Sequence, residues 1–377
     1  MKYSTSLALT ASLFSLTEAI QLVERATVCC SPINSAINVL TFFQRLPKVI
    51  ALDTNRKRSS LSATQRDSLR LRKRAGTVQE TLDNEDTLYF ANVTLGTPGQ
   101  TLRLDIDTGS SDIWTNSATS DLCQQDRTEC AQSGTYSAND SSTYTFVNSD
   151  FVIKYADGSF AQGDYGKDTL RIGGTSISGV QFGIGYNSTS SQGILGVGYE
   201  ANEAITSVTG KSYKNLPSLL ASQGKISSAA YSLWLNDLDA NTGSILFGGV
   251  DTEKYHGELA TVPIIKEQDA YQEFIIGLSS LTAAGQSIFK DSPIPVLLDS
   301  GSSLSYLPDS IAQSLYTVFK ATYDSQAQAA VVSCDMISST ATTDFSFSGA
   351  TISVPMNELV IVDGFRRGKP VCILGMF

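Results

Sequence analysis

Residues 104–111 read Leu-Asp-Ile-Asp-Thr-Gly-Ser-Ser, and residues 296–303 repeat the phrase as Val-Leu-Leu-Asp-Ser-Gly-Ser-Ser, 192 positions later. In each copy an apolar strand runs into an Asp-Thr/Ser-Gly-Ser-Ser loop, and an Ile-Leu-Gly element follows, within residues 193–196 and 372–375. A single Asp-Thr-Gly is weak evidence, because turns are rich in Asp and Gly. Two copies in matching apolar contexts predict two similar lobes, related by an approximate two-fold axis at which the loops meet.

Short strands dominate the pattern after residue 80. Apolar or alternating runs at 88–93 and 102–106 predict strands, and residues 151–170 predict a hairpin around a Gly-containing turn. Helical periodicity is confined to a stretch that begins at Asp309, as an N-cap, and to a weaker one at 216–223. We therefore expect an all-β, bilobal protein with minor helices.

The composition restricts the chemistry. The 377 residues are 41% hydrophobic and 17% charged, which is enough apolar material for a large core and more than one domain. The single histidine, His256, is expected in an exposed turn, so Ser-His-Asp and Cys-His hydrolases and HExxH zinc enzymes are excluded. A serine nucleophile at Ser110 is excluded because no His or nearby Lys could activate it. Carboxylates, hydroxyls or cysteines must carry the chemistry, and we expect neither a metal nor a cofactor.

Charge is distributed unevenly along the chain. Residues 1–74 carry 12 Lys/Arg against 4 Asp/Glu, whereas the rest has a net charge of −18. An acidic body disfavours nucleic acid as a partner, since phosphate binding requires a basic patch on the folded domain. The basic segment is more consistent with a detachable leader held by electrostatic attraction.

The amino-terminal segment has the features of a secretory leader. Residues 1–19 combine a basic start, an apolar run too short to span a bilayer and a small-residue cleavage site, which predict a signal peptide rather than a buried core helix. Residues 20–74 then form a basic propeptide whose last residues, 70–74, are either a kexin-like processing site or a solvated charge run. Processing would leave a mature chain that begins near Ala75. Residues 28–44 are unlike a typical propeptide and are either a translated intron or a genuine insertion.

Two carboxyls brought together at the axis would have a definite chemistry. Because two negative charges a few ångströms apart repel, the pair formed by Asp107 and Asp299 would hold one proton. A water between them could then lose a proton to the carboxylate while it attacks a carbonyl, and the protonated partner could polarise the carbonyl oxygen.

From about residue 85 to its end, the chain resembles the pepsin-like aspartic proteases, in particular secreted fungal members related to yapsins and candidapepsins. The resemblance is carried by the two Asp loops, the two Ile-Leu-Gly elements and the phrase Tyr-Ala-Asp-Gly-Ser at 155–159. It implies an acid-active endopeptidase, made as a zymogen and secreted, with an amino-terminal lobe over 75–270 and a carboxy-terminal lobe over 271–377. Its partners would be a peptide or protein substrate and its own propeptide, and we expect a monomer.

The resemblance also assigns roles to residues. Thr108 and Ser300 would tie the loops together, the neighbouring serines would hold the carboxylates, and a flap would close over the substrate. The assigned residues are the catalytic pair Asp107 and Asp299, the supporting residues Thr108, Gly109, Ser110, Ser300, Gly301 and Ser302, and the flap and substrate-binding residues Tyr155, Asp157, Gly158, Ser159 and Trp114.

Asp157, at the tip of the flap, has two interpretations. Asp is common in β-turns for structural reasons. Some fungal relatives use an acidic flap residue to favour Lys or Arg before the scissile bond, and the resemblance extends that hypothesis to this chain.

Six cysteines and three Asn-x-Ser/Thr triplets fit a secreted protein. Two pairs can close a short and a longer loop, whereas Cys29 and Cys30 lie in the leader, an unusual place for a structural bridge. The predicted disulfides are Cys123–Cys130 and Cys334–Cys372, and the candidate glycosylation sites are Asn92, Asn139 and Asn187.

The match to the family ends early. Members continue after Ile-Leu-Gly with an Asp and a further apolar segment, whereas this chain ends at Phe377. We expect the second lobe to be incomplete, which makes activity of this form doubtful, and a lipid anchor would lie beyond its end. The alternatives are a catalytically silent binding protein on the same scaffold and a carbohydrate-binding β module, which would not explain the duplicated Asp loops.

Overall fold

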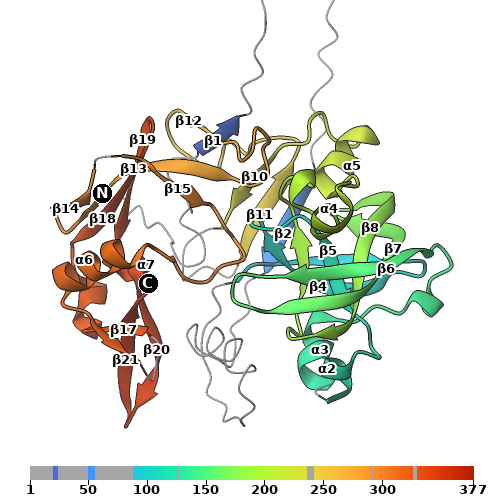
Figure 1. Cartoon of the computed structure of the whole chain (residues 1–377), viewed down its shortest axis with the longest axis horizontal. Helices are drawn as coiled ribbons and strands as arrows, with labels where there is room; N and C mark the ends of the chain where they lie inside the picture. The colour runs from blue at the N-terminus through green and yellow to red at the C-terminus, as the bar shows by residue number, and fades with distance from the viewer. Residues whose placement is uncertain are drawn as a thin grey trace, which may run out of the picture.

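The computed structural model describes residues 20–23, 50–55, 88–125, 127–235, 242–290, 292–325 and 329–377. It is mostly β with few helices, as predicted, and Figure 1 shows two bodies of strands side by side. The predicted signal peptide, the processing cluster at 70–74, residues 28–44 and the pair Cys29 and Cys30 lie outside the described residues.

The first lobe is built on a ten-stranded sheet with the order β10-β11-β2-β3-β4-β9-β5-β8-β7-β6. Its central strand β4 carries Leu102, Leu104 and Ile106 with fully buried side chains and ends at Asp107, so burial of alternate residues fixes where the first Asp loop begins. The strands are β2 (Ile50–Asn55), β3 (Phe90–Leu95), β4 (Gln100–Asp107), β5 (Ile113–Asn116), β6 (Thr145–Lys154), β7 (Phe160–Ile172), β8 (Thr175–Ser188), β9 (Gly193–Gly196), β10 (Tyr231–Trp234) and β11 (Thr242–Phe247).

The second lobe contains two smaller sheets. One has the order β14-β13-β18-β19 with β15 paired to β13, the other has the order β16-β17-β21-β20, and β1 pairs in parallel with β12. The strands are β1 (Ile20–Val23), β12 (Ala260–Pro263), β13 (Ile275–Ala283), β14 (Gln286–Phe289), β15 (Ile294–Leu297), β16 (Thr322–Asp324), β17 (Ala329–Val332), β18 (Thr342–Phe347), β19 (Ala350–Pro355), β20 (Val360–Arg366) and β21 (Lys369–Leu374).

Both predicted helices are present. The helix expected at 216–223 is α5, capped by Asn215, and the one expected from Asp309 is α6. Pro308 rather than Asp309 occupies the N-cap of α6, so Asp309 is its first helical residue. The helices are α2 (Asp121–Gln125), α3 (Arg127–Ser133), α4 (Ala204–Thr209), α5 (Leu216–Ser222), α6 (Asp309–Phe319) and α7 (Met356–Leu359), with 3-10 turns η1 (Ala138–Asp140), η2 (Glu200–Asn202) and η3 (Cys334–Ser338).

Each lobe has its own hydrophobic core. The first core draws its buried residues from positions 91–247 and the second from 262–376. Val262 and Ile264 pack into the second core although the predicted amino-terminal lobe extends to residue 270. Within the described residues, no helix is long and apolar enough to cross a membrane.

The two Ile-Leu-Gly elements have different strand partners. The first, in β9, runs parallel to β4 and sets Gly196 opposite Asp107. The second, in β21, runs antiparallel to β17 and β20 in a separate sheet. The two elements therefore share three residues but not their strand partners, and the Gly375 carbonyl accepts a hydrogen bond from the Ser305 amide, in the segment after the second Asp loop, at 2.9 Å.

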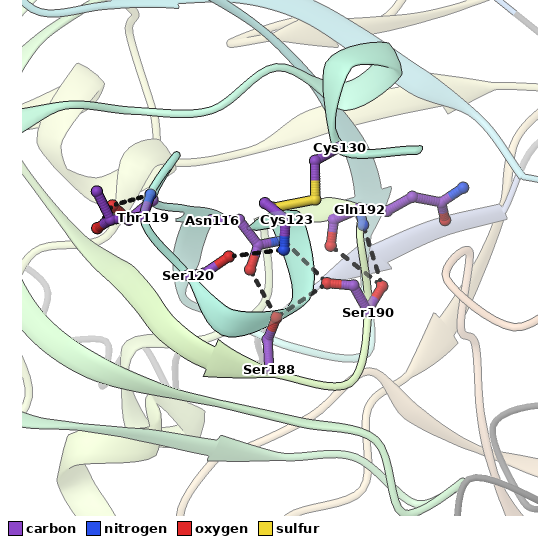
Figure 2. The surroundings of a disulfide bond; sticks show 9 residues. Asn116, Thr119, Ser120, Cys123, Cys130, Ser188, Ser190 and Gln192 are labelled. Atoms are coloured by element: carbon purple, nitrogen blue, oxygen red, sulfur yellow. Dashed lines mark hydrogen bonds between the residues drawn. A yellow bond between two sulfur atoms is a disulfide. The ribbon is translucent and has the colours of Figure 1, made fainter. Parts of the chain in front are cut away.

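The structure contains both predicted disulfides. Cys123–Cys130 joins α2 to α3, and Cys334–Cys372 joins η3 to β21. Figure 2 shows the first disulfide beside the turn after β8, where the Ser188 hydroxyl donates to Asn116 Oδ1 at 2.6 Å and Asn116 Nδ2 donates to the Ser190 carbonyl at 2.9 Å. These contacts connect the turn after β8 to β5, the strand that follows the first Asp loop.

Candidate active site

Strand β4 delivers Asp107 into a closely packed loop. Asp107 is only 5% exposed, and its carboxyl group accepts a hydrogen bond from the Gly109 amide at 2.8 Å and a short one from the Ser110 hydroxyl. These donors hold the carboxyl group in one orientation.

Asp299 follows β15 in a loop with the same contacts. Its Oδ1 accepts from the Gly301 amide at 2.9 Å, and its Oδ2 accepts from the Ser302 hydroxyl at 2.5 Å. The two copies of the sequence phrase therefore fold into the same local hydrogen-bonding pattern.

The two loops are tied to each other through reciprocal hydrogen bonds. The Thr108 hydroxyl donates to the Leu298 carbonyl at 2.7 Å and accepts from the Ser300 amide at 2.9 Å. The Ser300 hydroxyl donates to the Ile106 carbonyl at 2.7 Å and accepts from the Thr108 amide at 3.1 Å. This symmetric exchange holds the aspartates of the two lobes beside each other.

The two carboxyl groups lie against each other's glycines. A Cβ atom placed on Gly109 would lie 2.7 Å from Cγ of Asp299, and one placed on Gly301 would lie 2.8 Å from Oδ1 of Asp107. Only glycine leaves room for this approach. Burial, followed by the charge of Asp299, raises the pKa of Asp107 well above its usual range. A neutral acid and a carboxylate can therefore coexist in this site.

The predicted flap is the hairpin of β6 and β7. Tyr155 lies close enough to Asp107 that this carboxylate, after burial, contributes to raising the tyrosine's pKa, and its hydroxyl accepts from Trp114 Nε1 at 2.8 Å. Gly158 has a φ of 81° in the turn, where Asp157 Oδ1 accepts from the Ser159 amide at 2.8 Å and hydroxyl at 2.6 Å. Asp157 therefore stabilises the turn with at least one of its oxygens.

The sequence analysis missed a second group of buried acids next to the first loop. Asp112 is fully buried and accepts from the hydroxyls of Tyr165 and Tyr213, both at 2.8 Å, and from the Ala204 amide at 2.7 Å. Glu203 is 2% exposed and accepts from the Tyr213 amide at 2.7 Å. The one sequence signal was the Asp that directly follows Asp-Thr-Gly-Ser-Ser in the first copy alone.

Other predicted features lie away from the dyad. His256 is exposed in a loop, and the side chains of the three candidate glycosylation residues, Asn92, Asn139 and Asn187, are all exposed. Within the described ranges, no group of three or more His, Cys, Asp or Glu side chains is arranged to hold a metal ion.

Comparisons with known proteins agree with this geometry. The family model described as "Eukaryotic aspartyl protease" matches residues 88–377. A protein described as "Probable aspartic-type endopeptidase opsB" of Aspergillus oryzae is 49% identical over 348 residues, which cover 89% of this chain and 71% of the relative. The "Secreted aspartic protease 1" of Candida albicans is 37% identical, with 87% of this chain and 81% of the relative covered.

A solved structure shows the same fold. The crystal structure of aspartic proteinase from Irpex lacteus has a TM-score of 0.65 and 21% sequence identity, and the match covers 77% of this chain and 83% of that one. Together with the family match and the fungal relatives, this shows that the chain belongs to the eukaryotic aspartyl proteases and is an aspartic-type endopeptidase, a hydrolase of peptide bonds.

Proposed function

We propose that Asp107 and Asp299 are the catalytic pair and activate a water molecule for attack on the scissile peptide carbonyl. The observation that carries this proposal is the reciprocal Thr108–Ser300 exchange, which sets the two carboxyl groups face to face. Burial favours the neutral form of Asp107, so this residue begins as the acid and Asp299 begins as the base.

The steps follow from that protonation state. The carboxylate of Asp299 takes a proton from water as the oxygen attacks the carbonyl carbon, while the Asp107 carboxyl donates to the carbonyl oxygen. Collapse of the gem-diol intermediate requires a proton on the leaving nitrogen, which Asp299, now protonated, supplies, while Asp107 takes back a proton from a hydroxyl group of the intermediate as the product carboxyl forms. Both acids then return to the state with one shared proton.

The flap supports this chemistry by covering the dyad. Tyr155, held by the Trp114 indole at 2.8 Å, would exclude water, and the hairpin would orient a peptide through main-chain hydrogen bonds as an added strand. Gly109 and Gly301 leave room for the carboxyls, and Ser110 and Ser302 orient them.

Hydrolysis of a protein substrate at acid pH tests the assignment. Wild-type protein should cleave and should be blocked by pepstatin, whereas Asp107→Asn and Asp299→Asn should each lose activity by on the order of a thousandfold or more. Both variants must first show wild-type thermal unfolding. An active Asp107→Asn or Asp299→Asn protein would refute the assigned roles.

The basic leader fits a zymogen that is secreted. Strand β2, within the predicted propeptide, pairs with β11 and β3, so the leader supplies a strand to the sheet of the acidic first lobe. Secretion is supported by the relative described as "Secreted aspartic protease 1". The attraction would weaken as carboxylates are protonated at low pH, so isolated residues 20–74 should inhibit the mature enzyme near neutrality but not in acid or high salt.

A further part of the proposal is that the enzyme prefers a basic residue before the scissile bond. Asp157 lies at the flap tip, but its Oδ1 contacts with Ser159 favour the structural alternative. Comparing cleavage after Lys and after Leu in wild type and Asp157→Asn distinguishes the two: a specificity role predicts a selective loss after Lys, and a turn role predicts an equal loss at both.

A further inference from the structure

Two segments of different lobes meet beside the Asp loops. Tyr199, just before η2, stacks on Tyr271 with ring centroids 6.1 Å apart and packs against Phe274 at 4.9 Å. Residues 199–202 of the first lobe and 271–274 of the second therefore face each other, independently of the Thr108–Ser300 contacts.

Asn202 and Glu273 are polar members of this contact. Asn202 Nδ2 donates to the Gly109 carbonyl at 3.2 Å, and the Asn202 side chain lies close enough to the Glu273 carboxyl to lower its pKa. On the other side, the Phe274 carbonyl accepts from the amide of Leu298, the residue before Asp299, at 3.3 Å. Glu273 is thus connected to the first loop through Asn202 and lies one residue from a backbone bond to the second.

The surroundings of Glu273 are acidic. Burial, followed by the charges of Glu267 and Asp299, raises its pKa, and the Asn202 side chain acts in the opposite direction. Lys266 lies over the ring of Tyr271, 4.9 Å from its centroid. Within the described residues no Lys or Arg forms an ion pair with Glu273. When Glu273 ionises, its negative charge is added to the field at the dyad.

We propose that Asn202 and Glu273 are positioning residues of the dyad: Asn202 fixes the Gly109 carbonyl, and the Glu273 carboxylate extends the single-proton state of the dyad to higher pH. The inference rests on the proposed catalytic roles of Asp107 and Asp299. Its physical basis is that a like charge nearby disfavours loss of the last proton from a coupled pair of acids.

The test separates charge from hydrogen bonding. Glu273→Gln keeps the shape and the hydrogen-bonding capacity toward Asn202 but removes the charge. We expect the alkaline limb of the kcat/KM profile to move toward acid by on the order of half a pH unit, with the maximum within about twofold of wild type. The matched control is Glu258→Gln, which removes an exposed acid from the loop before β12 and should leave the limb unmoved.

Asn202→Ala tests the positioning role. Without the amide, the Gly109 carbonyl loses its donor, so kcat should fall by about fivefold to tenfold while KM changes by less than about twofold. Thermal unfolding of both variants should match wild type to within a few degrees, and a variant that unfolds is replaced by Glu273→Met, which is also uncharged, or by Asn202→Ser.

Two outcomes overturn the inference. One is a Glu273→Gln profile that superimposes on wild type or shifts only as much as Glu258→Gln, and the other is an unchanged kcat in Asn202→Ala. These results would leave the dyad assignment intact if Asp107→Asn and Asp299→Asn are inactive, whereas activity in either dyad variant would defeat both proposals.

Discussion

The two Asp loops share a sequence phrase and a hydrogen-bonding pattern but not an environment. The Asp107 loop is backed by β9, whose neighbouring residue Val197 donates its amide to the Asp107 carbonyl at 2.9 Å. In the described chain, the strand before Asp299, β15, pairs with β13 alone. Asp107 is buried and Asp299 half-buried. The local phrase fixes the contacts of each carboxyl, while the surrounding sheet determines its burial.

The position five residues beyond each catalytic candidate extends this difference. In the first loop it is Asp112, a buried acid within a tyrosine network, and in the second it is Leu304, a buried apolar residue. The first lobe therefore carries more buried ionisable groups close to the dyad than its counterpart does.

Replacing the glycine of either Asp loop by alanine should have the largest effect on activity. A methyl group on Gly109 would collide with the Asp299 carboxyl, and one on Gly301 with the Asp107 carboxyl, at 2.7 and 2.8 Å. Gly109→Ala and Gly301→Ala should each lower kcat by about a hundredfold or more, because the reacting groups lose their alignment. Gly277→Ala, whose new methyl would meet only Pro293 at 3.4 Å, is the control. Retained activity in one swap alone would show that the loops are not equivalent at the dyad.

The hydrogen bonds that Thr108 and Ser300 make between the two loops should have the next largest effect, and it should appear in stability rather than in reaction rate. Thr108→Val and Ser300→Ala each remove one hydroxyl and leave a carbonyl and an amide of the facing loop without a bond. Each should lower the free energy of unfolding by about 2–4 kcal/mol in urea titrations. Thr317→Val, on the exposed side of α6, should cost much less. Equal losses of unfolding free energy in Thr108→Val and Ser300→Ala would support the two-fold symmetry of the hydrogen bonds between the loops.

The fold and the dyad were readable from sequence because their signals are local or repeated. The paired loops, the flap turn at 155–159 and helix α6 each depend on patterns within a dozen residues. The partners of the second Ile-Leu-Gly element could not be predicted, because strand pairing is decided by distant residues: β21 pairs with β17 and β20.

Side-chain networks across long sequence distances could not be predicted. Asn202 lies 93 residues from Gly109, and the Ala204 amide lies 92 residues from Asp112. No periodicity connects such residues, so a polar side chain at these positions has the pattern of an ordinary surface residue until the fold places it. The division between the lobes at residue 270 likewise stays a prediction.

The buried acids of the first lobe predict a loss of stability toward alkaline pH. Burial raises the pKa of Glu203 to about 9, above the 4.5 of the unfolded chain. The folded state then binds more protons than the unfolded state between these values, so stability decreases as pH rises through that window. Glu203→Gln cannot ionise and should unfold at a midpoint about one pH unit higher than wild type. Glu253→Gln, on the surface, should not shift it.

The smallest effect should come from the serines that hold the carboxylates, and it gives the sharpest comparison of the loops. Ser110 is buried, so Ser110→Ala leaves a carboxyl oxygen that water reaches poorly, whereas Ser302 is half-buried and water can replace its hydroxyl. We expect kcat/KM to fall about tenfold for Ser110→Ala and about threefold for Ser302→Ala, since a buried carboxyl oxygen left without its donor costs more than one that water can reach. Ser310→Ala, exposed on α6, controls for loss of a serine hydroxyl. Equal losses in kcat/KM would mean that the burial difference between Asp107 and Asp299 disappears once a substrate covers both, and the asymmetry would then belong to the free enzyme alone.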